Sequence, residues 1–369
     1  MKLPKIRFKG FEGDWEEKKI DNICNRFDNL RIPISAKNRI SGSIPYYWAN
    51  GIQDYVDWYT HNWEFLLIAE DWANDLKNYP IQYVKWKIWV NNHAHVLQWK
   101  QELSNNIFLK YAIKHTNIES LLVWWWRAKL NASVLMWISI SLPSLPEQEK
   151  IWSLFELLDS HISKNRQKLE KLKNMKQSFL QKLFPKDWSA LPELRFKGFE
   201  GAWEERKLGE LAMITTWKLD ANAMNEDWIY DFYTSWIQKY KINTPVFKWP
   251  AITIAWNGAT VWYMHLADWL FNAYQRTYVL TQFKIKRTFL YYEMRKKLPQ
   301  KIQQEVRAWS IPYIVINMLT QLELGTPSLP EQEKIWAFFE KLDTQITQQS
   351  QKIQKLQNLK QSLLEKMFI

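Results

Sequence analysis

The chain has 369 residues, 47% of them hydrophobic, which is enough for two or three domains with cores of their own. Its formal charge of +12 and pI near 9.4 favour a polyanionic partner, nucleic acid ahead of a membrane surface, since no lipidation signal or amphipathic terminal anchor is evident. The sequence starts with charged residues and no apolar h-region, and it contains no run of 18 apolar residues, so we expect a cytoplasmic protein. Its single cysteine excludes an internal disulfide or a CxxC zinc site.

Two segments of the chain occur twice. The opening LPKIRFKGFEGDWEEKKI (3–20) returns as LPELRFKGFEGAWEERKL (191–208), with 13 of 18 positions identical. The segment SLPEQEKIWSLFELLDSHISKNRQKLEKLKNMKQSFLQKLF (144–184) returns at 328–368, with 25 of 41 identical. Such repetition predicts one structural plan built twice. We therefore expect four parts: a domain at 1–143, a helix at 144–184, a second domain at 185–327 and a second helix at 328–369.

The blocks between the repeats, about 21–143 and 209–327, differ in sequence but carry similar signals. Short apolar runs predict strands, and a longer apolar stretch late in each block predicts a helix. A faint similarity links IPYYWANGIQDY (44–55) to IYDFYTSWIQKY (229–240). We expect an α+β protein with two α/β domains, with strands at 64–69, 87–90, 250–255 and 278–281, and helices at 107–123 and 289–306.

Each repeated helix begins with a Leu-Pro pair followed by glutamates, which suit the positive end of a helix dipole. Apolar residues then recur by alternate steps of four and three, the heptad pattern of a coiled coil. The apolar seam comprises Ile151, Phe155, Leu158, Ile162, Leu169 and Leu172 in the first copy and Ile335, Phe339, Leu342, Ile346, Ile353 and Leu356 in the second. Both seams become polar at the same two steps, at Asn165 and Lys176 and at Gln349 and Lys360, and shared polar positions can fix register. The alternative is an ordinary buried hairpin in a larger α domain.

The tryptophan content is abnormal. The chain has 24 tryptophans and 9 glycines, whereas ordinary usage would give roughly 26 glycines. Many tryptophans follow Asp or Asn where turns favour glycine, because glycine accepts a positive φ without a Cβ clash. We infer that about 21 of them are glycine in the native cell, where a UGA codon is read under another genetic code. Trp15, Trp89 and Trp203, in strand-like or repeat-matched contexts, are expected to be genuine.

The stretch LVWWWRAKLN (122–131) is the densest case of this bias. Three adjacent indoles cannot all face one core from a helix or a strand. We interpret Trp124, Trp125 and Trp126 as glycines that form a tight exit from the preceding helix. The alternative is a genuine aromatic surface.

Motifs of a self-sufficient enzyme are missing from the sequence. It contains no GxxxxGK[ST] loop, no HExxH, no GxSxG and no Asn-Pro-Pro-aromatic tetrad of an amino-methyltransferase. His93 and His95 would share one face of a strand, as a metal pair does, but no third ligand is evident, so hydrogen bonding or packing is the favoured interpretation. We expect neither a catalytic centre nor a metal site in this chain.

With these repeats, the whole chain resembles the specificity subunit of type I restriction-modification systems. The marks that carry the resemblance are SLPEQEKI, KLEKLKNMKQSFLQKLF and the FKGFEGxWEE lead into each block. The resemblance implies two target recognition domains, each reading half of a split DNA sequence, separated by two antiparallel helices that dock methyltransferase subunits. It also implies a translocase-nuclease partner, with S-adenosylmethionine and ATP bound by the partners and no cofactor bound by this chain. The family position after EQEKI is commonly glycine, where this chain has Trp152 and Trp336.

Polar loop residues are the candidates for reading DNA, because Asn, Gln, Arg and Lys side chains bond base edges and phosphates. In the first block these are Asn50, Gln53, Asn74, Asn91, Asn92, His93 and Arg127. In the second block they are Gln238, Lys239, Asn257, Gln275 and Arg276. Two rival functions stay open: a stand-alone DNA-binding regulatory protein, and an aromatic-rich carbohydrate-binding protein that needs genuine, exposed indoles.

The glycine hypothesis predicts the mass of one tryptic peptide from the native cell, the peptide that ends at Arg127. We expect a mass with glycine at positions 124–126, measured by mass spectrometry of the protein isolated from its own host. A mass with three tryptophans would refute the hypothesis and restore the aromatic surface.

Overall fold

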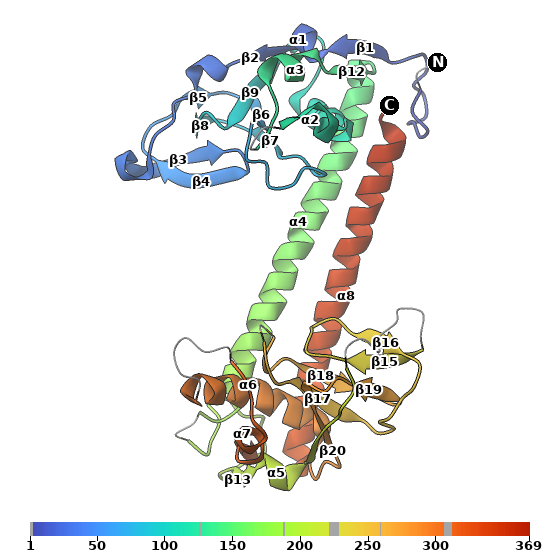
Figure 1. Cartoon of the computed structure of the whole chain (residues 1–369). Coiled ribbons are helices and arrows are strands. Elements are labelled where there is room, and N and C mark those ends of the chain that lie inside the picture. The colour runs from blue at the N-terminus through green and yellow to red at the C-terminus, as the bar shows by residue number, and fades with distance from the viewer. Residues whose placement is uncertain (1–2, 125–126, 187–188, 221–228, 259, 306–311) are drawn as a thin grey trace. The chain divides into compact units, whose positions relative to one another are not determined.

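The computed structural model describes the chain except for residues 1–2, 125–126, 187–188, 221–228, 259 and 306–311 (Figure 1). It divides into two compact units. Unit 1 comprises residues 1–166 together with 351–369, and unit 2 comprises residues 167–350. The two long helices, α4 (Leu145–Lys182) and α8 (Leu329–Met367), contribute one part to each unit.

Unit 1 contains two four-stranded sheets, in the orders β2-β9-β6-β7 and β4-β3-β8-β5. Strands β1 and β12 form a further antiparallel pair, and helix α2 lies against the first sheet. The element bounds are β1 Glu16–Lys19, α1 Ile20–Ile23, β2 Cys24–Arg26, η1 Asp28–Leu30, η2 Ala36–Asn38, β3 Ser41–Trp48, β4 Gly51–Val56, β5 His61–Asn62, β6 Phe65–Ala69, β7 Ile81–Val84, β8 Lys87–Val90, β9 Ala94–Trp99, α2 Asn106–His115, η3 Ile118–Leu121, β10 Val123–Trp124, β11 Ala128–Lys129, α3 Ala132–Trp137 and β12 Ser139–Leu142.

Unit 2 repeats this plan, although its variable block has a different sequence. Its sheets have the orders β14-β20-β17-β18 and β16-β15-β19, and β13 pairs with β21. The parallel pair β3 and β8 of unit 1 has its counterpart in the parallel pair β15 and β19. The bounds are β13 Glu204–Lys207, α5 Leu208–Leu211, β14 Met213–Thr216, β15 Tyr230–Tyr233, β16 Tyr240–Ile242, β17 Ala251–Ala255, β18 Met264–Ala267, β19 Phe271–Ala273, β20 Thr277–Thr281, α6 Arg287–Glu305, α7 Ile316–Thr320 and β21 Glu323–Thr326.

The predicted fold class is therefore confirmed, with two mixed α/β domains, a duplicated plan and long helices that pack together. All four expected strands form, as β6, β8, β17 and β20. Among the described residues, no helix is both long and apolar enough to cross a membrane.

The expected helix at 107–123 is wrong at its C-terminal end. Helix α2 stops at His115, because Thr116 takes an extended backbone conformation and the Asn117 side chain accepts from the backbone N–H of Ser120, which starts the short helix η3. The stretch 122–131 is therefore not the exit of that helix: β10 and β11 pair across it. Trp125 and Trp126 themselves lie outside the described residues.

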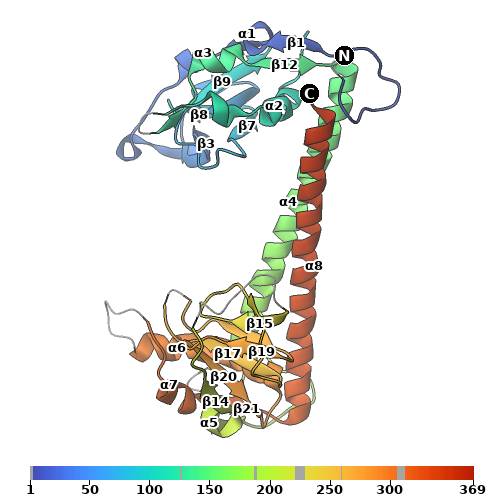
Figure 2. The same cartoon turned by 45° about the vertical axis from the view of Figure 1, so that its right-hand side comes forward.

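The core of each unit contains the same aromatic cluster. In unit 1, Phe368 just past α8 contacts Trp15, Phe108 and Phe155, with ring centroids 5.4 to 6.3 Å apart. In unit 2, Phe184 just past α4 contacts the matching rings at 5.5 to 6.0 Å, namely Trp203, Phe289 and Phe339. Helix α4 starts in unit 1 and ends at the core of unit 2, whereas α8 starts in unit 2 and ends at the core of unit 1. Within each unit the two helices therefore run antiparallel (Figures 1 and 2).

The seam positions expected from the heptads are buried or half-buried in both helices. The lysines that interrupt the seam form ion pairs within each unit. In unit 1, Lys360 of α8 pairs with Asp159 of α4, which also accepts a hydrogen bond of 2.7 Å from the Tyr111 hydroxyl. In unit 2, Lys176 pairs with Asp343, which accepts a bond of 2.6 Å from Tyr292. The lysine step of each seam thus has a specific partner on the facing helix.

The repeated lead fastens onto the start of each long helix. Arg7 donates two bonds of 2.7 Å to the carboxylate of Glu147, a residue that is only 1% exposed, and a third to the Gly13 carbonyl. Arg195 and Glu331 repeat this bidentate pair in unit 2. Gly13 has a φ of +81°, which a residue with a Cβ rarely adopts. In each unit, this pair therefore joins the segment RFKGFEGxWEE to the segment SLPEQEK.

Backbone angles support the glycine hypothesis. Five residues other than glycine have a positive φ in the described part of the chain, and three are tryptophans: Trp72, Trp86 and Trp262. A left-handed conformation costs a residue with a Cβ roughly 1–2 kcal/mol. By contrast, Trp15 and Trp203, expected to be genuine, are buried at 3% and 4% exposure. Trp152 and Trp336 lie inside α4 and α8 and leave the starts of both helices intact.

We predict that Trp86→Gly raises the free energy of unfolding by about 1 kcal/mol, because glycine relieves the positive φ and this indole is 78% exposed. The matched control is Trp63→Gly, at an exposed indole whose φ is not positive. It should give no gain, since glycine there only enlarges the entropy of the unfolded chain. Urea unfolding of the full chain measures both, and equal destabilisation by both changes would contradict the prediction.

The duplicated packing predicts that residues 1–184 self-associate. Such a fragment lacks Leu364, Met367 and Phe368 of the unit 1 core, but a second copy can supply Leu180, Leu183 and Phe184 from the matching positions. Lys176 of one copy would then pair with Asp159 of the other. We expect a dimer by analytical ultracentrifugation, weakened by Asp159→Lys and restored by adding Lys176→Asp. A fragment that stays monomeric at high concentration would argue against this pairing.

Candidate nucleic-acid interface

Two adjacent carboxylates that follow β6, Glu70 and Asp71, bind side chains from several loops of unit 1. Glu70 bonds Arg31 at 2.7 Å and Lys129 at 2.9 Å, and these bonds hold the Glu70 pKa below its ordinary value although burial alone would raise it. Asp71 is buried and binds His93 at 2.6 Å and Arg127 at 2.8 Å. Two of the predicted DNA-binding residues, His93 and Arg127, are therefore brought together on one carboxylate.

The two histidines of this segment have different surroundings. His93 is half-buried and packs edge-on against Trp48, with ring centroids 5.1 Å apart. His95 is fully buried, with Nδ1 at 2.7 Å from Asp28 and Nε2 at 2.9 Å from the Leu130 carbonyl. The rings of His93 and His95 are thus engaged with carboxylates of the protein.

Two of the predicted asparagines, Asn50 and Asn91, hold the backbone in place. Asn50 donates to the Trp72 carbonyl at 2.8 Å and accepts from the Asn74 backbone N–H at 3.0 Å, so it joins the β3–β4 turn to the loop after β6. Asn91 is buried, and its side chain accepts from the backbone N–H of His93 at 2.8 Å. Asn74 is exposed beside Asn50. Asn50 and Asn91 thus position the loops through bonds to the backbone.

Gln53, Asn92 and His93 line a shallow hollow of about 270 Å³. Tyr46 and Trp48 of β3 form part of its wall. Gln53 and Asn92 are exposed, so their amides can meet a groove of DNA.

Arg39 also lines this hollow, and sequence reasoning missed it. Its guanidinium lies 4.2 Å from the centroid of the Tyr46 ring and donates to Asp54 at 3.2 Å and to Gln53 at 3.3 Å. Its Nε is buried and has no hydrogen-bond partner in the described part of the chain. The sequence shows only that Arg39 precedes a strand. Its contacts with Gln53 and Asp54 of β4 depend on the pairing of β3 with β4, which the local sequence does not encode.

In unit 2, the predicted residues lie in two neighbouring loops. Asn257 follows β17 and Arg276 precedes β20, and these ends are joined by a bond of 3.2 Å from the Trp256 N–H to the Arg276 carbonyl. Gln275 is exposed and donates to Asp220 at 3.4 Å. Arg276 is exposed as well, so this end of the sheet presents an arginine and two amides.

Gln238 and Lys239 lie in the loop before β16. Both are exposed, and Lys239 bonds Asp231 at 3.4 Å above the Tyr233 ring. The Thr260 hydroxyl donates to the Ser235 carbonyl, which links this loop to the segment after β17. The five predicted residues of unit 2 therefore belong to one end of the domain.

Comparison with known proteins places this geometry in a family. The family model described as type I restriction modification DNA specificity domain matches residues 12–174 and again residues 200–358. The chain belongs to this family. There is one match for each structural repeat, and each match takes in the second half of a lead, a variable block and most of a long helix.

Curated relatives resemble part of the chain. A type I restriction enzyme specificity subunit of Haemophilus influenzae is 44% identical over 149 residues, 40% of this chain and 38% of that protein. The EcoDI specificity subunit of Escherichia coli is 37% identical over 161 residues, 44% of this chain and 35% of that protein. In both comparisons, the chain spans little more than a third of the length of the relative.

Solved structures share the fold over the full chain. The S subunit of a type I restriction-modification system from M. genitalium superposes with a TM-score of 0.73 at 16% identity, covering 100% of this chain and 99% of the other. A chain from a structure that addresses complex assembly and conformational transition of the type I R-M system gives a TM-score of 0.55 at 16% identity, covering 98% and 99%. These similarities concern the fold alone.

Proposed function

We propose that this chain is the DNA-recognition subunit of a type I restriction-modification complex and that it has no catalytic activity of its own. The observation that carries the proposal is the double match to the specificity-domain family, once for each structural repeat. Each unit would bind one half of a bipartite DNA sequence. The methyltransferase and translocase-nuclease subunits would supply the chemistry, with S-adenosylmethionine and ATP bound there, and the complex would act in the cytoplasm.

The loops described above support direct reading of bases. In unit 1, Arg39, Gln53 and Asn92 offer donors and acceptors of the kind that pair with guanine and adenine in the major groove. In unit 2, Gln275 and Arg276 offer the same chemistry. His93, Arg127 and Lys239 would add contacts to bases or phosphates, and the net charge of +12 favours binding to a polyanion.

The long helices would serve as the docking surface for methyltransferase subunits. Their buried seams and ion pairs are used within the chain, whereas their remaining faces carry many exposed polar and charged residues. A stand-alone regulatory protein would need no such partners. Loss of adenine methylation on deletion of the gene would therefore distinguish the two functions.

Deletion of the gene should remove one bipartite adenine-methylated motif from the host methylome, as measured by long-read sequencing of native DNA. Complementation with Gln53→Ala should then relax one base in one half of the motif, since a bidentate amide contact is worth about 1–3 kcal/mol of discrimination. Gln275→Ala should act on the other half. The control is Gln101→Ala, in the exposed turn after β9 and away from the long helices and the candidate loops. An unchanged methylome after deletion would refute the proposal.

A further inference from the structure

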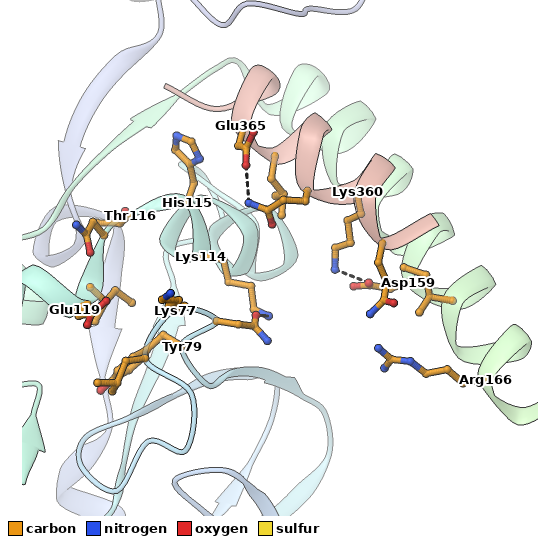
Figure 3. A pocket seen from close by; sticks show the side chains of 18 residues that line it. Lys77, Tyr79, Lys114, His115, Thr116, Glu119, Asp159, Arg166, Lys360 and Glu365 are labelled. Carbon is orange, nitrogen blue, oxygen red and sulfur yellow. Dashed lines mark hydrogen bonds and ion pairs between the residues drawn. The ribbon is translucent and has the colours of Figure 1, made fainter. Parts of the chain in front are cut away.

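Unit 1 contains a second hollow, and its lining includes none of the predicted DNA-binding residues. Its volume is about 730 Å³, and it lies between helix α2, the loop before β7 and the parts of α4 and α8 that belong to unit 1. Lys114, Lys360 and Arg166 converge on it from α2, α8 and α4 (Figure 3). Lys77 and Asn78 line it from the loop before β7.

Cations outnumber carboxylates at the place where Lys114, Lys360 and Arg166 meet. Asp159 lines this part of the hollow, and it already binds Lys360 and the Tyr111 hydroxyl and lies 3.9 Å from Lys110. The charge of Asp75 also acts on Lys114, but less than the charges of Lys360 and Lys110. Glu119 and Glu365 line more distant parts of the hollow (Figure 3). Lys114 is half-buried, and its Nζ donates to the neutral Asn78 side chain at 3.2 Å.

The protonation of Lys114 reflects this imbalance. Burial, followed by the charges of Lys360 and Lys110, lowers the pKa of Lys114 to about 8. A bound anion would offset both effects. The site is thus prepared for negative charge from outside the chain, in addition to that of Asp159.

We propose that this hollow binds a phosphate group of the DNA backbone, held by Lys114 and Arg166. The proposal rests on the proposed function of the chain. The hollow is far larger than a single phosphate ion, so it suits a phosphate carried by a polymer that crosses it. Arg166 suits such a contact, because its exposed guanidinium can bond two oxygens of one phosphate. A contact of this kind adds affinity and sets the position of the DNA without reading a base.

The second unit offers only part of this arrangement. The position of Lys360 is repeated by Lys176 and that of Lys114 by Arg295, which lies over Tyr291 and donates to its hydroxyl at 2.9 Å. The position of Arg166 is taken by Ser350. We therefore assign the phosphate contact to the half of the target that unit 1 binds.

The test compares the full chain in complex with its methyltransferase subunits, as wild type and as Arg166→Gln and Lys114→Gln. Lys9→Gln is the control, since it removes the same charge from an exposed position in the lead of unit 1 that does not line the hollow and is not on a long helix. Affinity is measured against salt concentration for a duplex that carries the methylated motif and for a scrambled duplex. Arg166 is exposed, so its replacement should leave the fold intact, which thermal unfolding checks.

We expect each change in the hollow to make the slope of log K for DNA binding against log salt concentration shallower by about 0.9. Each change should weaken binding to both duplexes equally, and the control should alter neither the slope nor the affinity. Unchanged slopes would overturn the proposal. If slopes stay unchanged while calorimetry shows that inorganic phosphate binding is lost, the ligand is a free anion. If slopes stay unchanged while assembly with the methyltransferase is lost, the ligand is an acidic protein surface. Failure of the wild type to prefer its motif would instead refute the proposed function, because the slopes remain measurable on the scrambled duplex.

Discussion

The architecture depends on one ion pair, used twice, between the long helices. Each pair places a lysine from an otherwise apolar seam against an aspartate of the facing helix, with a tyrosine hydroxyl as the second donor. A leucine-rich seam alone tolerates a shift by a heptad, because apolar side chains then still face apolar side chains. Such a shift would leave Lys360 and Asp159 half-buried and unpaired, which costs far more than an apolar mismatch. The pairs therefore select one antiparallel register.

Once the register is fixed, the cores of the two units follow. The phenylalanine just past the end of each long helix packs against a phenylalanine near the start of the other helix, as Phe368 does against Phe155 and Phe184 against Phe339. The hydroxyls of Tyr111 and Tyr292 connect α2 and α6 to the same ion pairs. The Arg7–Glu147 and Arg195–Glu331 pairs then hold the lead of each domain against its helix. Most residues of this frame belong to the repeated segments, while the candidate interface loops belong to the blocks that differ in sequence. The chain can thus change what each domain binds without changing how it folds.

The frame could be predicted from the sequence, whereas the residues expected to read DNA stay predictions. Long heptads and repeated motifs give signals that tertiary contacts do not override, and strands such as 64–69 are continuous apolar runs. The end of α2 was missed because the apolar pattern continues past His115, whereas Thr116 and Asn117 start a new turn. The amides of Asn50 and Asn91 turned out to bond the backbone, and Arg39 was overlooked. Residue type alone does not say whether an amide meets its own backbone or solvent, since that depends on pairings between distant strands.

The glycine hypothesis bears directly on the interface. Trp48 lines the hollow beside His93, and Trp72 lies under the Arg127 guanidinium at 5.4 Å while it adopts a positive φ. With glycine at both positions, Asp71 would still hold His93 and Arg127, but His93 would lose its contact with Trp48 and Arg127 would lose its contact with Trp72. The hollow would be wider and its loops freer to adapt, at a higher entropic cost on binding. Base reading would then rest on the carboxylate-anchored residues and on Arg39, whose own stacking partner, Tyr46, is a tyrosine and does not depend on the codon.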